Sequence, residues 1–206
     1  MIQSFKNFCQ IGSQSFKVSW DVEELCKCFD GDLVDPLATP ERGHLAFSDP
    51  SGKPHWQPYP TNIYFARNFS KKFPDECNEV VGKIKMLQRR LEKGKHELID
   101  RFLEHRVDYR RVNLIKNYAS NEVSPHIDKL RVLTLNIGLK NSNSGITHVC
   151  NGTNPDDFIK GPLESFQMQD GDAYLLNVSN FHSVKPVSPT ATSFRYLITY
   201  TVINRD

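Results

Sequence analysis

The strongest constraint on the fold is an alternation of apolar and polar side chains that starts near residue 110. In LRVLTLNIGL, residues 130–139, every second position from Leu133 onward is Leu or Ile. Because a strand turns successive side chains to opposite faces, this pattern predicts a strand with one apolar face. Similar patterns predict strands at 111–118, 172–179 and 193–203, with weaker candidates at 146–150 and 163–169. Several short strands separated by polar loops are typical of a β-sandwich or jelly roll.

The front half of the chain has a different character. A short helix is predicted at 21–29, with Asp21 favouring its start. Apolar residues at helical spacing run through 75–105, which predicts one long helix, or two with Gly94 as the break. Residues 35–62 hold six prolines and are predicted to form loop with little regular structure.

Helices in front and strands behind predict the α+β class. From the strand pattern, the expected architecture is a β-sandwich or jelly roll with flanking N-terminal helices. We expect one domain over residues 1–206, in which the helical and loop elements of 1–109 pack on a barrel core at 110–203.

Composition excludes several classes of protein. The formal net charge of +2 gives no reason to expect nucleic acid as an obligatory partner. No apolar run is long enough to span a bilayer, and the N-terminus lacks the pattern of a secretory signal. The five cysteines are irregularly spaced and odd in number. We therefore expect reduced thiols in a reducing compartment, the cytoplasm.

His126 and Asp128 stand just before the strand predicted at 130–139. In an extended chain, side chains two residues apart point the same way, as two ligands of one metal ion require. A His-x-Asp pair arises readily by chance, so a strand-end His beside a surface Asp is the alternative interpretation. His182, which follows the strand predicted at 172–179, supplies a third candidate ligand.

Arg195 lies in the strand predicted at 193–203, on the face opposite Phe194 and Tyr196. A buried Arg needs an anionic partner, and the alternatives are a salt bridge within the protein or a bound carboxylate. Two His and one carboxylate leave three positions open, which suits non-haem Fe(II). The Arg would then pair with the far carboxylate of a dicarboxylate cosubstrate.

The order of His126 and Asp128, then His182, then Arg195 resembles that of the Fe(II)/2-oxoglutarate-dependent oxygenases. The phrase GDAYLLNVSNFHSV is similar to the family segment that precedes the second His. The resemblance covers about residues 110–203 and implies a double-stranded β-helix, that is a jelly roll, here with flanking N-terminal helices. It also implies His126, Asp128 and His182 as iron ligands and Arg195 as the partner of the 2-oxoglutarate carboxylate.

A narrower resemblance concerns the aspartyl/asparaginyl β-hydroxylase branch, to which HIDKLRVLTLNIGL, GDAYLLNVSNFHSV and FRYLITYTV are similar. Members of that branch often carry an Asn shortly after HSV, where this chain has Lys185-Pro186. The nucleic-acid demethylases of the superfamily usually show a second Arg where this chain has Thr201.

Further residues are candidates for the cavity. Asn136 and Thr134 occupy the inward face of their strand, so Asn136 is expected either to bond to 2-oxoglutarate or to be a satisfied inner polar residue. Tyr118 is expected to bond to the cosubstrate or to close the core. Arg131 is interpreted as a surface residue or as the holder of a substrate carboxylate, and His148 as structural or exposed.

The expected function is an Fe(II)- and 2-oxoglutarate-dependent dioxygenase that hydroxylates an amino acid, a peptidyl side chain or a small metabolite. Asp128 favours hydroxylation over halogenation, which needs that coordination position vacant. Two alternatives remain: a non-catalytic jelly-roll binding protein, and a cupin-like metalloenzyme that does not use 2-oxoglutarate.

Overall fold

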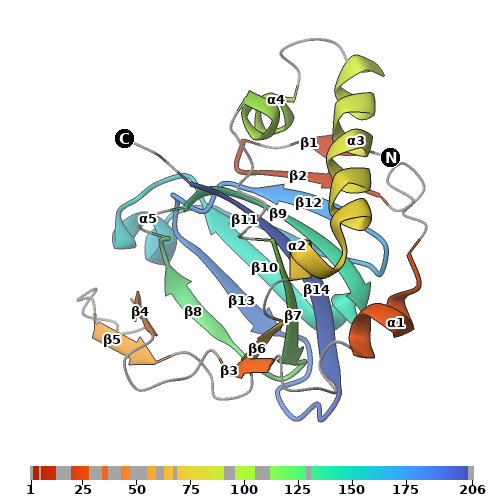
Figure 1. The fold of residues 1–206 in the computed structure, drawn as a ribbon. Coiled ribbons are helices and arrows are strands. Elements are labelled where there is room, and N and C mark those ends of the chain that lie inside the picture. The colour runs from red at the N-terminus through yellow and green to blue at the C-terminus, as the bar shows by residue number, and fades with distance from the viewer. Residues whose placement is uncertain are drawn as a thin grey trace.

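The computed structural model describes residues 2–4, 6–12, 20–27, 34–36, 43–46, 55–58, 63–66, 69–90, 96–104, 112–128 and 131–203. Two antiparallel sheets face each other, and helices cover the outer side of the larger one (Figure 1). This is a jelly roll with flanking helices, as predicted.

The larger sheet contains, in spatial order, β1 (Ile2–Ser4), β2 (Phe8–Ile11), β12 (Ala173–Leu176), β9 (Arg131–Lys140), β14 (Phe194–Ile203), β7 (Val112–Tyr118), β6 (Ile63–Ala66) and β3 (Val34–Pro36). The smaller sheet contains β11 (Leu163–Gln167), β10 (Gly145–Cys150), β13 (His182–Pro186) and β8 (Val123–His126). A separate pair is formed by β4 (Gly43–Ala46) and β5 (His55–Pro58). The helices are α1 (Val22–Cys26), α2 (Phe69–Lys72), α3 (Pro74–Arg90), α4 (Glu97–Glu104), α5 (Pro155–Lys160) and the 3-10 turn η3 (Ser142–Ser144).

The main core lies between the larger sheet and helices α3 and α4. On β9, Leu133, Leu135 and Ile137 are fully buried in this core. They pack with Ile84 of α3 and Phe102 of α4, both also fully buried. The apolar face of the strand therefore packs against the apolar faces of the two helices. Burial of apolar area on both sides holds the helices on the sheet.

The opposite face of the larger sheet looks toward the smaller sheet. Phe8 of β2 stacks on Phe166 of β11 with ring centroids 4.4 Å apart, and Phe166 meets the edge of Tyr174 at 4.6 Å. These aromatic rings fill the space between the two sheets near β2 and β11. On β9 this inner face carries Thr134 and Asn136, as the alternation predicted.

Most of the predicted strands are confirmed. The candidates at 111–118, 130–139, 193–203, 146–150 and 163–169 correspond to β7, β9, β14, β10 and β11. The strand predicted at 172–179 is shorter, because β12 ends at Leu176 and the chain turns before β13.

The front half departs further from its prediction. The side chain of Asp21 accepts a hydrogen bond from Glu24 N–H at 3.1 Å, which confirms that α1 starts there. The segment 75–105 forms the two helices α3 and α4, and Gly94 lies outside the described residues. The front half also adds four strands to the larger sheet, which the sequence did not predict.

The prediction that 35–62 has little regular structure is wrong at its described positions, since β4 pairs with β5 and β3 pairs with β6. Proline lacks a backbone N–H, but it is tolerated on edge strands and at strand ends. Pro36 ends β3 at the edge of the larger sheet, and Pro58 ends β5.

The turn between β11 and β12 is built by Asp170 and Gly171. Gly171 has a φ of 81°, in the left-handed region that favours glycine. The Asp170 carboxylate accepts hydrogen bonds from the N–H groups of Asn141 and Ser142, at 3.2 and 2.7 Å. This turn therefore anchors the chain where it crosses from β9 to β10.

None of the helices in the described residues is both long and apolar enough to cross a membrane.

Candidate metal centre and its cavity

Strands β8 and β13 bring two histidines together from distant parts of the chain. His126 and His182 are register partners in this antiparallel pair, and their ring centroids are 4.3 Å apart. Asp128 follows β8, and its N–H donates to the carbonyl oxygen of Val178 at 3.0 Å. This hydrogen bond joins the segment after β8 to the segment before β13, and so holds Asp128 beside the histidines.

Each imidazole ring is oriented by a backbone carbonyl. Nδ1 of His126 is 2.8 Å from the carbonyl oxygen of Ser124, and Nδ1 of His182 is 3.0 Å from that of Asn180. A carbonyl can only accept a hydrogen bond, so we assign the ring proton to Nδ1 in both residues. The lone pair is then on Nε2, which is the form that binds a metal.

The electrostatics of the site favour neutral histidine. Burial, with a further contribution from the neighbouring His182, lowers the pKa of His126 to about 4. His126 is therefore neutral at physiological pH, as a metal ligand must be.

The ligand atoms of His126, Asp128 and His182 lie within 4.8 Å of one another. At bond lengths of about 2.1 Å, two ligands of one ion are at most about 4.2 Å apart. A small contraction would thus place all three on a single ion. Among the described residues, this is the one group of three or more His, Cys, Asp or Glu side chains placed to hold a metal.

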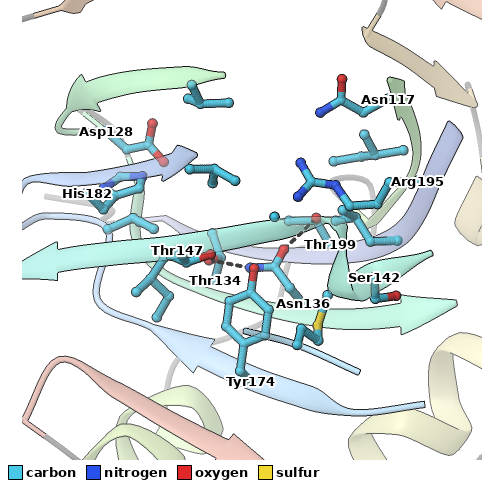
Figure 2. Close-up of a pocket in the computed structure, with 18 of the residues that line it drawn as sticks. Asn117, Asp128, Thr134, Asn136, Ser142, Thr147, Tyr174, His182, Arg195 and Thr199 are labelled. Carbon is cyan, nitrogen blue, oxygen red and sulfur yellow. Dashed lines mark hydrogen bonds between the residues drawn. The ribbon is translucent and has the colours of Figure 1, made fainter. Parts of the chain in front are cut away.

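The three residues line a cavity of about 200 Å³ between the two sheets. Figure 2 shows Asp128 and His182 at one side of this cavity, with Arg195 pointing into it from the other. Apolar side chains, among them Val184 and Leu197, line the walls around these polar groups. A ligand in the cavity would therefore meet a metal site and a cation on opposite sides.

Arg195 is a buried cation, and none of the residues that the structure describes places a carboxylate beside it. Its exposed fraction is 8%, and its Nε has no hydrogen-bond partner. Burial lowers the pKa of Arg195, and the nearby Tyr174 hydroxyl opposes this shift. Among the described residues no carboxylate forms an ion pair with Arg195, so the structural salt bridge considered from sequence is not found there. Within the described part of the chain, the Arg195 guanidinium is therefore placed to pair with an anion that enters the cavity.

Asn136 forms part of the cavity wall. The Thr199 hydroxyl donates to Asn136 Oδ1 at 2.6 Å, and Asn136 Nδ2 donates to Thr134 Oγ1 at 3.2 Å (Figure 2). The Tyr174 hydroxyl, which sequence reasoning missed, forms hydrogen bonds with Asn136 and Thr147. These contacts fix the Asn136 amide from several sides, so it is a satisfied inner polar residue that also faces the cavity.

Tyr118 is not brought into the cavity by the structure. Its ring stacks on Phe194, with centroids 4.2 Å apart. The neighbouring Asn117 lines the cavity instead and is the register partner of Arg195.

The two remaining candidates lie in different places. Arg131 lines the cavity and is partly exposed, with Nη1 3.8 Å from Oδ2 of Asp128. His148 is on the smaller sheet, where its Nδ1 lies 2.7 Å from the Ser165 hydroxyl.

Comparisons with models of protein families and with curated proteins find no match. Solved structures match in fold. The alpha-ketoglutarate-dependent epimerase SnoN from nogalamycin biosynthesis gives a TM-score of 0.60 at 10% identity, covering 96% of this chain and 76% of SnoN. The carbocyclase SnoK from the same biosynthesis gives 0.58 at 11%, covering 97% and 80%. An oxidoreductase of the 2OG-Fe(II) oxygenase family from Burkholderia pseudomallei gives 0.57 at 10%, covering 96% and 85%. The chain shares their jelly-roll fold.

Proposed function

We propose that this protein is an Fe(II)- and 2-oxoglutarate-dependent dioxygenase. The observation that carries the proposal is the placement of two kinds of site across one cavity: a set of two histidines and one carboxylate, and a buried Arg that pairs with no carboxylate of the described residues. The first is the donor set typical of non-haem Fe(II) with open positions. The second matches the free carboxylate of a diacid that binds the metal by its other end.

The residues present fit iron and 2-oxoglutarate. Nε2 of His126, Nε2 of His182 and a carboxylate oxygen of Asp128 would hold the metal. The solved neighbours support this assignment, because SnoN has also been solved with Fe3+, alpha ketoglutarate and nogalamycin RO. When bound, iron supplies the redox centre at which dioxygen oxidises the substrate while 2-oxoglutarate is converted to succinate and CO₂.

The chain itself contributes orientation and charge. The Ser124 and Asn180 carbonyls fix the ring planes of the two histidines. Arg195 would bind the distal carboxylate of 2-oxoglutarate through two parallel hydrogen bonds. Apolar side chains that line the cavity, such as Val184 and Leu197, would lower the local dielectric constant around this pair and so strengthen it.

Hydroxylation is the proposed outcome, on a free amino acid, a peptidyl side chain or a small metabolite. Asp128 supports it, because a carboxylate at that position leaves no site for a halide. The structurally similar proteins include an epimerase and a carbocyclase, so the fold does not define the reaction. The reaction has to be measured directly. A place near the aspartyl/asparaginyl β-hydroxylase branch is proposed on sequence phrases alone, and a reducing, cytoplasmic setting on buried thiols such as Cys77.

The test is 2-oxoglutarate turnover by the purified protein with Fe(II) and dioxygen, first alone and then with a library of amino acids, peptides and metabolites. We expect succinate formation that requires iron and oxygen and that is lost in His126→Ala. The alternatives give different results in anaerobic titration. A cupin-like enzyme would bind Mn(II) but not 2-oxoglutarate, and a non-catalytic binding protein would bind neither.

A further inference from the structure

Gly145 stands where the side chain of Arg195 crosses the cavity. Arg195 belongs to β14 of the larger sheet, and Gly145 opens β10 of the smaller sheet. A Cβ built on Gly145 would collide with Nη1 of Arg195, would lie 3.0 Å from Cγ1 of Val184 and would lie 3.5 Å from Cζ of Arg195. The guanidinium therefore occupies the space that any other residue at 145 would fill.

The backbone does not explain why residue 145 is glycine. Gly145 has φ −135° and ψ 146°, which is extended backbone that any residue adopts. Gly171, by contrast, has a positive φ. The close approach of Arg195 is thus the physical reason for a missing side chain at 145.

We propose that Gly145 is a positioning residue for the cosubstrate. It provides the space in which the Arg195 guanidinium lies, and so sets where the distal carboxylate of 2-oxoglutarate is bound. This inference rests on the proposed function. It assigns to a residue without a side chain a role in cosubstrate affinity that acts wholly through Arg195.

The collision is of a kind that the fold tolerates. The atom that Gly145→Ala would meet first is the end of a flexible side chain, which can move aside. Gly138 is different, because a Cβ there would lie 2.8 Å from the backbone carbonyl of Gln169 and 2.5 Å from Oγ of Ser142. We expect Gly145→Ala to displace the Arg195 guanidinium while the sheets stay in place.

The experiment compares wild type, Gly145→Ala, Gly82→Ala and Arg195→Met. Mn(II) affinity and then 2-oxoglutarate affinity are measured by anaerobic calorimetry, which needs no turnover. Gly82 is the matched control, since nothing lies within 4 Å of a Cβ built there. Gly145→Ala should leave Mn(II) affinity unchanged and lower 2-oxoglutarate affinity about tenfold to a hundredfold, as expected for one charge-assisted hydrogen bond.

The outcomes separate the two proposals. If wild type binds no 2-oxoglutarate, the proposed function fails and this inference fails with it. If wild type binds it and Arg195→Met binds it about a hundredfold more weakly, but Gly145→Ala binds as wild type does, only the role of Gly145 is overturned. A parallel fall in Mn(II) affinity would also overturn it, because the effect would then be a general distortion of the site.

A double variant covers the case in which Gly145→Ala folds poorly. Arg195→Ala removes the group that the new methyl meets, so adding Gly145→Ala to it should lower the melting temperature little. If Gly145→Ala is unstable with Arg195 present and tolerated with Arg195→Ala, the contact is confirmed. If it is equally destabilising in both, Gly145 serves the sheet rather than Arg195, and the inference is wrong. Gly138→Ala should be destabilising in both.

Discussion

Among single residues, Arg195 separates a cosubstrate site from a structural ion pair. Arg195→Met keeps an unbranched stem and removes the charge. The affinity for 2-oxoglutarate should fall about a hundredfold, given about 1.5–3 kcal/mol per charge-assisted hydrogen bond and 1.4 kcal/mol per factor of ten. Without ligands the variant should be as stable as wild type or more stable, since it removes a buried cation for which the described residues offer no carboxylate partner.

Calorimetry and urea unfolding of the ligand-free protein check both halves of this prediction. Arg101, in the last turn of α4, provides a control Arg→Met change outside the cavity. If Arg195→Met instead lost about 3–5 kcal/mol of stability and kept its 2-oxoglutarate affinity, Arg195 would be one half of a buried structural pair.

The histidines carry the second prediction at this scale. His126→Ala and His182→Ala should each lower Mn(II) affinity more than about a hundredfold. Mutating a residue that only hydrogen-bonds to a metal ligand already lowers metal affinity about 10–100-fold. Metal titration is the measurement, with circular dichroism to verify folding. His148→Ala is a matched control on the same sheet, where the ring lies against Ser165. Unchanged affinity in both ligand variants would refute the metal site.

The grouping of the candidate ligands with Arg195 was implied by a family resemblance. Strand alternation itself predicted only which side chains share a face. The same rule, applied to β7, favours Asn117 over Tyr118. Val112 and Leu114 point to the helical core, so Asn117 points to the cavity. Tyr118 shares the face of Val112 and Leu114, so alternation favours its alternative role of closing the core. Gly145 could not be predicted, because its role depends on a contact across two sheets.

For the individual elements, long and regular strands were predictable and short ones were not. β9 and β14 alternate over ten residues each. β8 and β13 span four and five residues and both contain proline, so local pattern gives little signal for either. What makes them strands is their pairing, with His126 against His182. The elements that build the candidate metal centre are thus those that local sequence pattern defines least well.

The packing of helix α4 on the larger sheet should contribute strongly to the stability of the fold. Phe102 is fully buried against the larger sheet, so Phe102→Ala should lower the free energy of unfolding by about 3–5 kcal/mol. Urea unfolding is the measurement. Ile159→Ala, at a side chain that is 47% exposed, is the control and should change stability by less than about 0.5 kcal/mol. The folded fraction should keep its Mn(II) affinity, and a loss of metal affinity would show that α4 shapes the site.

At the scale of the whole molecule, metal should stabilise the folded protein, and 2-oxoglutarate should stabilise it more when metal is already bound. Mn(II) at a hundred times its dissociation constant should add about 2.7 kcal/mol, because it binds only where β8 and β13 are paired. Adding 2-oxoglutarate should raise the melting temperature again, and more with Mn(II) present than without it. Thermal unfolding in the four conditions is the check. Equal shifts from 2-oxoglutarate with and without metal would contradict binding across the cavity.

Alternation and turn residues in the back half of the chain predicted a β-sandwich or jelly roll, and the family resemblance narrowed this to the jelly roll. The joining of β1, β2, β3 and β6 to the larger sheet was not predicted. β2 pairs with β12, so Ile11 lies beside Ala173. Pairing over such distances along the chain is decided by the whole packed structure, and no local pattern encodes it.

The two halves of the candidate site belong to different sheets. His126 and His182 are on the smaller sheet, and Arg195 is on the larger one. On the proposed function, a diacid of fixed length is bound by one sheet at each end. Its binding constant therefore depends on the distance between the two sheets. The Phe8–Phe166 stack contacts neither the candidate metal ligands nor Arg195, but it lies between the sheets. A change there that moves the sheets apart should lower the affinity for the diacid, as moving the guanidinium would.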